Sequence, residues 1–410
     1  MNILYNTAIA LYSAGARLFA MRDVKARKMV GGQRRTMGYL REAIVPGESY
    51  IWIHASSLGE FEQGRPMIEM IKERLPEKKI LLTFFSPSGY EVRKNYPVVD
   101  AVCYLPFDCP ARVRKFLDAI NPEMAIFIKY EFWGNYLQEL HRRNIPTYLI
   151  SAIFRQSQSF FKWWGGMFRG MLGCYTGIYV QDEESRQLLA GVGVDNVIIA
   201  GDTRFDRVSD IMAHNVDIPQ AKAFTSSGCL TVVAGSSWSP DEDFILPYFN
   251  THKELKLIIA PHEVNAERLA DIESRLKRRS CRMSVASVEE ASRVDCLIVD
   301  SYGKLSSLYR YGDLAYIGGG FGEGIHNINE AAVYDMPVVF GPRYGKFKEA
   351  KDLIARGGAY SFTDEREFTE VIDRLVSDKD ALARSGEIAG AYIRENLGAT
   401  ERVFDDIFRR

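Results

Sequence analysis

The stretch that decides the fold is Trp52-Ile53-His54-Ala55-Ser56-Ser57-Leu58-Gly59-Glu60. Residues 50–54 form an apolar run of strand length, and the small residues and glycine after it predict a short loop that opens a helix. In an open α/β sheet, ligands bind outside the carboxyl ends of the strands, so Glu60 is expected to face a substrate. The free N–H groups of a helix N-terminus would keep this carboxylate ionised, which suits a general base. The position equally suits an acidic residue whose only role is to favour the helix dipole.

Length and composition indicate a folded protein of several domains. With 410 residues, 47% hydrophobic and 26% charged, the chain predicts roughly two to three domains. The net charge of −1 provides no global field for nucleic acid, and no nucleic-acid partner is expected. The six cysteines and six histidines are dispersed without metal-ligand spacing, so we expect reduced thiols and no metal site.

Strand-like and helix-like segments alternate along the chain, which predicts parallel sheets with right-handed crossovers. Helix-like stretches include 64–74 and 183–190. The strands expected in a first series are 50–54, 79–85, 101–105, 124–129, 147–151, 177–180 and 197–200, and those in a second series are 230–234, 256–260, 296–299, 314–317 and 338–340. A polar segment near 217–220 separates the two series, so we expect an α/β protein with two Rossmann-like domains facing a cleft.

The N-terminus has a different character. Residues 3–20 are largely apolar, with Arg17 inside them, and the basic residues Arg22, Lys25, Arg27, Lys28, Arg34 and Arg35 follow. Charge that follows the apolar run argues against a cleavable signal, and Arg17 makes a spanning helix marginal. The pattern favours a helix at the cytoplasmic face of a membrane, and the alternative is an amphipathic helix packed on the domain. Residues 160–169 also mix aromatics with cations, which suits a lipid-facing helix or, for most of these aromatics, the core.

A glycine-rich segment follows the expected strand 314–317. Gly318, Gly319, Gly320, Gly322 and Gly324 lead into a helix predicted to open near Asn327. Glycines allow a ligand close to the backbone, and a helix N-terminus donates N–H groups to phosphate. Glu330 is placed to accept hydrogen bonds from a ribose. The spacing is not a dinucleotide fingerprint, which disfavours a nicotinamide cofactor, and a purely structural tight turn is the alternative.

Three other loops follow strands in the same way. Arg204 is placed to face a leaving phosphate, or else to pair with Asp202 or Asp206. Ser86 and Ser88 offer hydroxyl and N–H donors to an anionic group. Pro261-His262-Glu263 follows a strand of the second series and would line the same cleft.

Together these segments resemble the 3-deoxy-D-manno-octulosonic acid (Kdo) transferases of lipid A biosynthesis over nearly the whole chain. The stretches that carry the resemblance are His54-Ala55-Ser56-Ser57-Leu58-Gly59-Glu60, Ser86-Pro87-Ser88-Gly89, Glu131-Phe132-Trp133-Gly134-Asn135, Gly201-Asp202-Thr203-Arg204-Phe205-Asp206, Gly235-Ser236-Ser237, the segment from His326 to Glu330, and Phe340-Gly341-Pro342. The resemblance implies a GT-B glycosyltransferase fold, CMP-Kdo as donor, a lipid A precursor (lipid IVA) as acceptor, inversion at the anomeric carbon, and no metal or other cofactor.

The resemblance also implies roles for individual residues. Glu60 matches the general base, and Arg204 matches a basic position that stabilises the transition state. The stretches that match CMP contacts are Pro261 and His262, then Gly303, Lys304 and Leu305, then Asn327, Ile328, Asn329 and Glu330.

Three departures from the family pattern affect the charges around the leaving group. Lys129 stands where the family has a carboxylate, ahead of Glu131; Gly134 replaces a proline; and Pro261-His262-Glu263 lacks an arginine.

The resemblance completes the expected organisation. We expect a membrane-associated helix with its basic flank at 1–35, an acceptor-binding domain at 36–210 and a CMP-Kdo-binding domain at 211–410. The expected location is the inner membrane, peripheral or singly anchored, with the catalytic domains in the cytoplasm. The alternatives are another GT-B enzyme that uses a UDP-sugar, or a non-catalytic membrane-associated binding protein.

Overall fold

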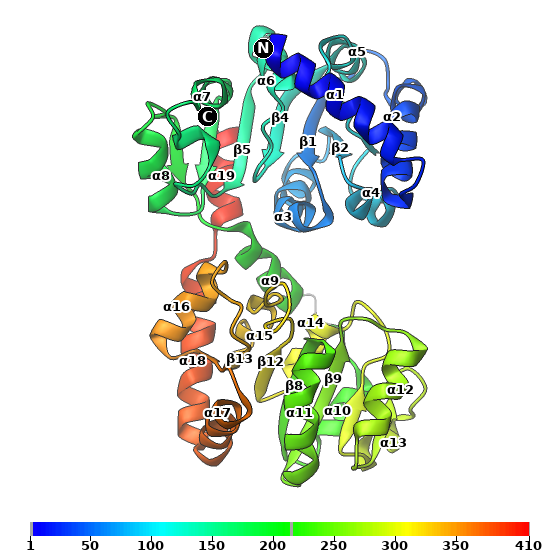
Figure 1. Cartoon of the computed structure of the whole chain (residues 1–410), viewed down its shortest axis with the longest axis vertical. Coiled ribbons are helices and arrows are strands. Elements are labelled where there is room, and N and C mark those ends of the chain that lie inside the picture. Colours follow the sequence, from blue (N-terminus) through cyan, green and yellow to red (C-terminus); the bar gives the residue numbers. More distant parts are fainter. Residues whose placement is uncertain (1–2, 214–215, 410) are drawn as a thin grey trace. The chain divides into compact units, whose positions relative to one another are not determined.

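The computed structural model describes residues 3–213 and 216–409 and divides the chain into two compact units. Unit 1 comprises Met1–Arg207 and Leu397–Arg410, and unit 2 comprises Val208–Asn396 (Figure 1). The C-terminal helix α19 (Ala399–Phe408) therefore belongs to unit 1, although the expected boundaries placed all of 211–410 in one domain. The reason is burial, because α19 supplies Val403, Phe404 and Ile407 to the core of unit 1.

Unit 1 is built on a seven-stranded parallel sheet with the order β3-β2-β1-β4-β5-β6-β7. Its strands are β1 (Tyr50–Ala55), β2 (Lys79–Phe84), β3 (Ala101–Tyr104), β4 (Pro122–Ile128), β5 (Thr147–Ala152), β6 (Gly177–Val180) and β7 (Val197–Ile199). Its helices are α1 (Ile3–Phe19), α2 (Val24–Ala43), α3 (Leu58–Arg74), α4 (Pro87–Arg93), α5 (Pro110–Ile120), α6 (Gly134–Arg142), α7 (Gly166–Leu172), α8 (Glu183–Ala190), α19 and the start of α9 (Thr203–Ala213). Helices flank the sheet, so both faces of the strands are covered (Figure 1).

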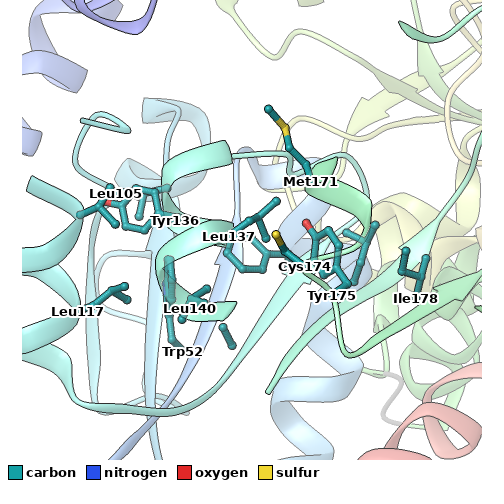
Figure 2. Close-up of a cluster of buried hydrophobic side chains, with 14 of the residues drawn as sticks. Trp52, Leu105, Leu117, Tyr136, Leu137, Leu140, Met171, Cys174, Tyr175 and Ile178 are labelled. Atoms are coloured by element: carbon teal, nitrogen blue, oxygen red, sulfur yellow. The ribbon is translucent and has the colours of Figure 1, made fainter. Parts of the chain in front are cut away.

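Strand β1 is buried on both faces, which explains its apolar run. Trp52 lies in one core cluster of unit 1 (Figure 2). Ile51 and Ile53 lie in a second cluster, as the alternation of side chains along a strand requires. The Trp52 ring contacts those of Phe127 and Tyr136, with centroids 5.1 and 5.4 Å apart. Its indole N–H donates to Thr83 Oγ1 at 2.8 Å. The loop that leads to Glu60 therefore starts from a rigid strand.

Unit 2 is a second seven-stranded parallel sheet, with the order β10-β11-β9-β8-β12-β13-β14. Its strands are β8 (Leu230–Ser237), β9 (Leu255–Pro261), β10 (Ser280–Arg282), β11 (Cys296–Ile298), β12 (Leu314–Ile317), β13 (Val338–Phe340) and β14 (Ala359–Ser361). Its helices are α10 (Pro219–Thr225), α11 (Ser239–Thr251), α12 (Ala266–Arg275), α13 (Val288–Arg293), α14 (Leu305–Leu308), α15 (Asn329–Ala332), α16 (Lys348–Arg356), α17 (Glu365–Ser377) and α18 (Lys379–Glu395).

The prediction of two Rossmann-like α/β domains is confirmed, and every strand expected in the two series is present. The sequence analysis missed β10 and β14. Both are three-residue strands at the edges of the sheet of unit 2, and no residue of β10 is fully buried, so neither has the apolar run of a central strand.

Helix α1 packs on unit 1 through specific polar contacts. The Tyr5 hydroxyl donates to Asp108 Oδ2 at 2.6 Å, and Asn135 Nδ2 donates to Asn6 Oδ1 at 2.9 Å. Ala20 of the α1–α2 turn is buried with Val30 and Phe107. The inner face of α1 therefore packs on unit 1, as expected if the segment is an amphipathic helix docked on the domain.

The outer face of α1 is apolar and exposed. Leu4, Leu11 and Leu18 follow one another at seven-residue spacing, with exposed fractions of 75%, 69% and 69%. Among the described residues, no helix has both the length and the apolar content needed to span a bilayer. Association of this helix with a membrane surface stays a prediction.

The aromatic stretch 160–169 divides between core and surface. Phe160 is buried in the core of unit 1, and Phe161, Met167 and Phe168 pack against that core. Trp163 and Trp164 are 92% and 52% exposed. Core packing thus accounts for the phenylalanines of this stretch but not for its tryptophans.

The docking of α2 on unit 1 can be tested with two glycines of this helix. A Cβ at Gly32 would lie 2.2 Å from the buried Tyr104 ring, whereas a Cβ at Gly38 would meet nothing within 4 Å. We expect Gly32→Ala to destabilise the protein by about 1–3 kcal/mol through overpacking, and Gly38→Ala to stabilise it by about 0.5–1 kcal/mol through helix propensity. Calorimetric unfolding of both variants measures this. Shifts of the same sign in both variants would contradict the close packing of α2 on Tyr104.

Candidate active site

Each sheet has a point where the strand order reverses, and ligands of open α/β sheets bind there, outside the carboxyl ends of the strands. In unit 1 this point lies between β1 and β4, and in unit 2 it lies between β8 and β12. The loops that leave β1 and β4 carry Glu60 and Glu131. The loops that leave β8 and β12 carry Trp238 and His326.

Glu60 is the third residue of α3 and is half-buried. Its Oε2 accepts hydrogen bonds from the backbone N–H and the hydroxyl of Ser57, both at 2.8 Å. These two bonds fix the carboxylate in the first turn of the helix, as the sequence predicted. Because both bonds go to Oε2, Oε1 has no protein partner within the described residues and can take up a proton.

Glu131, in the loop after β4, is 3% exposed and lies within electrostatic range of Glu60. Its Oε2 lies 3.1 Å from His54 Nε2 and accepts from the Trp133 indole N–H at 2.5 Å. The other ring nitrogen of His54, Nδ1, lies 3.1 Å from Thr83 O and 2.9 Å from Thr83 Oγ1. A chain of hydrogen bonds thus links β2, β1 and the loop after β4.

The two carboxyl groups have opposite pKa shifts. Burial raises the pKa of Glu60, the charge of Glu131 raises it further, and the bonds from Ser57 and the charge of His54 offset only part of this. Burial would also raise the pKa of Glu131, but the charge and hydrogen bond of His54 and the bonds from Ser56 and Trp133 outweigh it and leave that pKa below its usual range. The bonds from Ser57 at the helix N-terminus thus lower the pKa of Glu60, in the expected direction, but burial and Glu131 outweigh them. A raised pKa brings a glutamate closer to the working pH, which still suits a general base.

Lys129 and Tyr130 directly precede Glu131 in the sequence, and Tyr130 lines a pocket. Lys129 has a left-handed backbone, with φ of 70°, and its Nζ lies 5.4 Å from the centre of the Tyr130 ring. Burial raises the pKa of the Tyr130 hydroxyl, the charges of Arg155 and Arg204 lower it, and Glu60 raises it, so this hydroxyl lies within electrostatic range of all three. A cavity of about 470 Å³ is lined by Tyr130, Phe132, Arg155, Ser157, Gln158, Ser159, Phe160 and Phe168.

Arg204 pairs with Asp202, one of the alternatives that the sequence left open. Its Nε and Nη2 lie 2.8 and 2.6 Å from Asp202 Oδ2. Asp206 instead accepts from the backbone N–H groups of Gly398 and Thr400 at 2.6 and 2.7 Å, at the start of α19. Arg204 keeps 28% side-chain exposure, so a ligand can still reach it.

Ser86 and Ser88 lie at the start of α4, close to the Glu60 loop. Their hydroxyls are 3.0 Å apart, and the Ser86 backbone N–H donates to Ser56 O at 2.7 Å. Unit 1 therefore brings together five of the predicted residues: Glu60, Glu131, Lys129, Ser86 and Ser88.

In unit 2, three aromatic rings stack where the strand order reverses. The His262 ring stacks on the rings of both Trp238 and His326, with centroids 4.5 Å apart in each pair. The Trp238 indole N–H donates to His326 Nε2 at 3.1 Å. Burial, together with the charge of His262, lowers the pKa of His326 to about 4, so this ring is neutral at neutral pH.

A hydrogen-bonded group next to this stack contains Glu330. Its two carboxylate oxygens accept from Ser306 Oγ at 2.7 Å and from Asn327 Nδ2 at 3.1 Å. Gly303, Lys304 and Leu305 precede Ser306, and both Gly303 and Lys304 are exposed. Other predicted residues of this site, Pro261, Ile328 and Asn329, have buried side chains and offer mainly backbone groups to a ligand.

The glycine-rich loop is a tightly packed turn. A Cβ at Gly318 would lie 2.1 Å from Ser236 O, and one at Gly320 would lie 2.6 Å from the backbone of Gly341. Close backbone packing in a tight turn, the alternative to ligand binding, therefore explains why these two positions are glycine. The helix that follows, α15, begins at Asn329 and is four residues long, so it contributes little of the dipole expected to bind phosphate.

The sequence analysis did not assign roles to His54, Trp133, Tyr130 or Arg155. His54 and Trp133 belonged to quoted motifs, but their contact with Glu131 depends on the pairing of β1 with β4. No group of three or more His, Cys, Asp or Glu side chains in the described part of the chain is arranged to hold a metal ion.

Comparison with solved structures identifies the fold. UDP-GlcNAc 2-epimerase from Neisseria meningitidis has a TM-score of 0.60 with 14% identity, over 88% of this chain and 100% of that chain. This likeness concerns the fold alone and confirms the predicted GT-B class.

Comparison of sequences finds similarity to one enzyme family. Residues 27–207 match the family model described as 3-deoxy-D-manno-octulosonic-acid transferase (kdotransferase). A 3-deoxy-D-manno-octulosonic acid transferase of Aquifex aeolicus is 26% identical over 366 residues, which are 87% of this chain and 95% of that protein. A bifunctional glycosyltransferase/methyltransferase of Fusobacterium nucleatum is 26% identical over 362 residues, and the chain spans 55% of its length. On these matches, the chain is similar over most of its length to 3-deoxy-D-manno-octulosonic acid (Kdo) transferases, and residues 27–207 match the model of that family.

Proposed function

We propose that the protein transfers Kdo from CMP-Kdo to a lipid A precursor such as lipid IVA, with inversion at the anomeric carbon. The observation that carries the proposal is the environment of Glu60, where one carboxylate oxygen is fixed by Ser57 and the other is available. Similarity to the Kdo transferases supports the donor and the class of acceptor. The proposed location is the cytoplasmic face of the inner membrane.

In the proposed step, Glu60 takes the proton of an acceptor hydroxyl as the hydroxyl oxygen attacks the anomeric carbon of Kdo. The bond from that carbon to the CMP phosphate breaks, and CMP leaves with the electron pair. The raised pKa of Glu60 favours this proton transfer, because a base is most effective when its pKa approaches the working pH. Glu131 does not touch the substrate in this scheme; it sets the charge next to the base.

The donor is assigned to unit 2, where Asn327, Glu330 and the exposed Lys304 surround the loop after β12. Glu330 accepts from Ser306 and Asn327 and is oriented to accept hydrogen bonds from a ribose diol. Arg204 is proposed to stabilise the charge of the departing phosphate, and Lys129 to contribute a second cation. In this scheme side-chain cations and backbone N–H groups take the role that a divalent metal has in other transferases.

The acceptor is assigned to unit 1. The cavity beside Tyr130 combines the cationic Arg155 with the rings of Phe132, Phe160 and Phe168. Cationic and aromatic groups together suit a ligand that has both anionic and hydrocarbon parts.

The direct test is mass spectrometry of lipid IVA after incubation with the protein and CMP-Kdo. A mass increase of one or more Kdo residues is expected, and UDP-GlcNAc in place of CMP-Kdo should give none. Thermal protection by CMP, with none by UDP, is expected in parallel. Protection by UDP alone would favour the alternative GT-B enzyme.

Glu60→Gln should reduce turnover by roughly 10²–10⁴-fold, because the amide keeps the shape but cannot accept the proton. CMP affinity and the unfolding temperature should stay near those of the wild type. Glu73→Gln is the matched control, since Glu73 is an exposed glutamate in the same helix. Turnover of Glu60→Gln within threefold of the control would remove Glu60 from the role of base.

Glu131→Gln should move the acidic limb of the pH–rate profile to lower pH. Glu60 must be ionised to act as a base, so the rate falls as the pH drops through the pKa of Glu60. The charge of Glu131 raises that pKa, and its removal lowers it. Glu139→Gln is the control with the same change of charge, because Glu139 is paired with Arg142 and Arg143 on α6. A limb that stays in place or moves to higher pH would contradict the coupling.

Asn327→Ala and Glu330→Ala should each weaken CMP-Kdo binding by about 1.5–3 kcal/mol, the typical value of a charge-assisted hydrogen bond. Calorimetry measures this directly. Glu323→Ala, at an exposed position of the same loop, should leave the affinity unchanged. Wild-type affinity in both site variants would place the donor elsewhere.

A further inference from the structure

A second pocket of unit 1 lies beneath the N-terminal helices. It has a volume of about 260 Å³ and is formed by α1, α2, the loop after β3 and the start of α5. Its lining residues are Arg17, Val30, Gln33, Arg34, Met37, Pro106, Phe107, Arg112 and Lys115. None of these residues has a role in the proposed transfer.

Four of the lining residues are cations: Arg17, Arg34, Arg112 and Lys115. Within residues 3–213 and 216–409, none of the four forms an ion pair with a carboxylate. Arg112 lies over the Phe107 ring, 6.0 Å from its centre. Four like charges around one small cavity repel one another, so an anion inside the cavity would be strongly favoured.

Gln33 provides an independent indication of a ligand. It is 7% exposed and lines the same pocket, and among the residues that the structure describes neither its amide nitrogen nor its amide oxygen has a hydrogen-bond partner. A buried amide without a partner costs free energy that a ligand with hydrogen-bonding groups would recover. The amide N–H of Gln33 and the guanidinium groups are all donors, which matches the oxygens of a phosphate group.

The surroundings of the pocket indicate what the phosphate is attached to. Val30, Met37 and Phe107 give the pocket an apolar wall. Leu18 on α1 adjoins Arg17 in the sequence and belongs to the exposed apolar row of this helix, with 69% exposure. A ligand with a phosphate head and a hydrocarbon tail satisfies both features.

We propose that this pocket binds the phosphate head group of a membrane lipid whose hydrocarbon tail lies along the exposed face of α1. The site would give unit 1 a defined attachment to a lipid, beyond general attraction between a basic surface and an anionic membrane. The proposal does not depend on the transfer reaction.

The probe for the test is dihexanoyl phosphatidic acid, a short lipid that is titrated as a monomer into the full-length protein and followed by calorimetry. We expect saturable binding of one lipid per protein. Arg112→Gln should weaken binding at least about tenfold, since it removes a charge-assisted bond. Gln33→Glu should abolish binding, because it places a negative charge against the phosphate.

Lys25→Gln is the matched control. Lys25 is an exposed cation of α2 that does not line the pocket, and its substitution changes the net charge equally. Its affinity should stay within twofold of the wild type. Equal losses in Lys25→Gln and Arg112→Gln would overturn the proposal in favour of a diffuse basic surface. Gln33→Glu places a charge at a buried position, so its unfolding temperature is measured as well, and Arg112→Gln, at a partly exposed position, decides the outcome.

Titration of two further ligands distinguishes a lipid phosphate from free inorganic phosphate. Dihexanoyl phosphatidylcholine, which has no net charge, should bind at least tenfold more weakly than the phosphatidic acid. Inorganic phosphate should bind much more weakly, because it lacks the tail. Equal affinity for inorganic phosphate would overturn the lipid assignment, and the absence of any saturable binding would overturn the site itself.

Discussion

The hydrogen-bonded pair of His54 and Glu131 is the interaction on which the site of unit 1 depends. It joins the end of β1 to the loop after β4, the two strands between which the chain order reverses. A buried carboxylate is costly unless its oxygens are satisfied, and here His54, Trp133 and Ser56 satisfy them. The same carboxylate acts electrostatically on Glu60. One buried charge therefore fixes the geometry of the loop and tunes the pKa of the proposed base.

The sequence was sufficient for all strands except β10 and β14 and for the position of Glu60, and the physical reason is local. A strand buried on both faces needs a continuous apolar run, as in 50–54, and a first-turn glutamate after a small-residue loop is recognisable from spacing alone. The edge strands β10 and β14 lack that run and were missed. The contact of His54 with Glu131 was also missed, because it joins residues far apart in the sequence and exists only once β1 and β4 pair in register.

Competition for hydrogen-bond partners explains why Arg204 pairs with Asp202 and not with Asp206, a choice that the sequence spacing left undecided. Asp202 and Asp206 were equally placed to pair with it. The N-terminus of α19 presents backbone N–H groups that need acceptors, and Asp206 takes them, together with the Thr400 hydroxyl. Asp202 is then left for Arg204. The partner of Arg204 thus depends on a helix from the other end of the chain, and the sequence near residue 204 gives no information about that helix.

The charge arrangement of unit 2 has a consequence for the donor. Where the family pattern has an arginine, this chain has His262, whose ring stacks on those of Trp238 and His326. His326 accepts a hydrogen bond through Nε2 and has a pKa of about 4, so at neutral pH it brings no positive charge. A phosphate monoester bound nearby would therefore meet dipoles and N–H groups from this stack, and a full charge only from a residue such as the exposed Lys304. An anion close to His326 would favour the protonated form of this ring, so binding of the proposed donor here would be linked to the uptake of a proton.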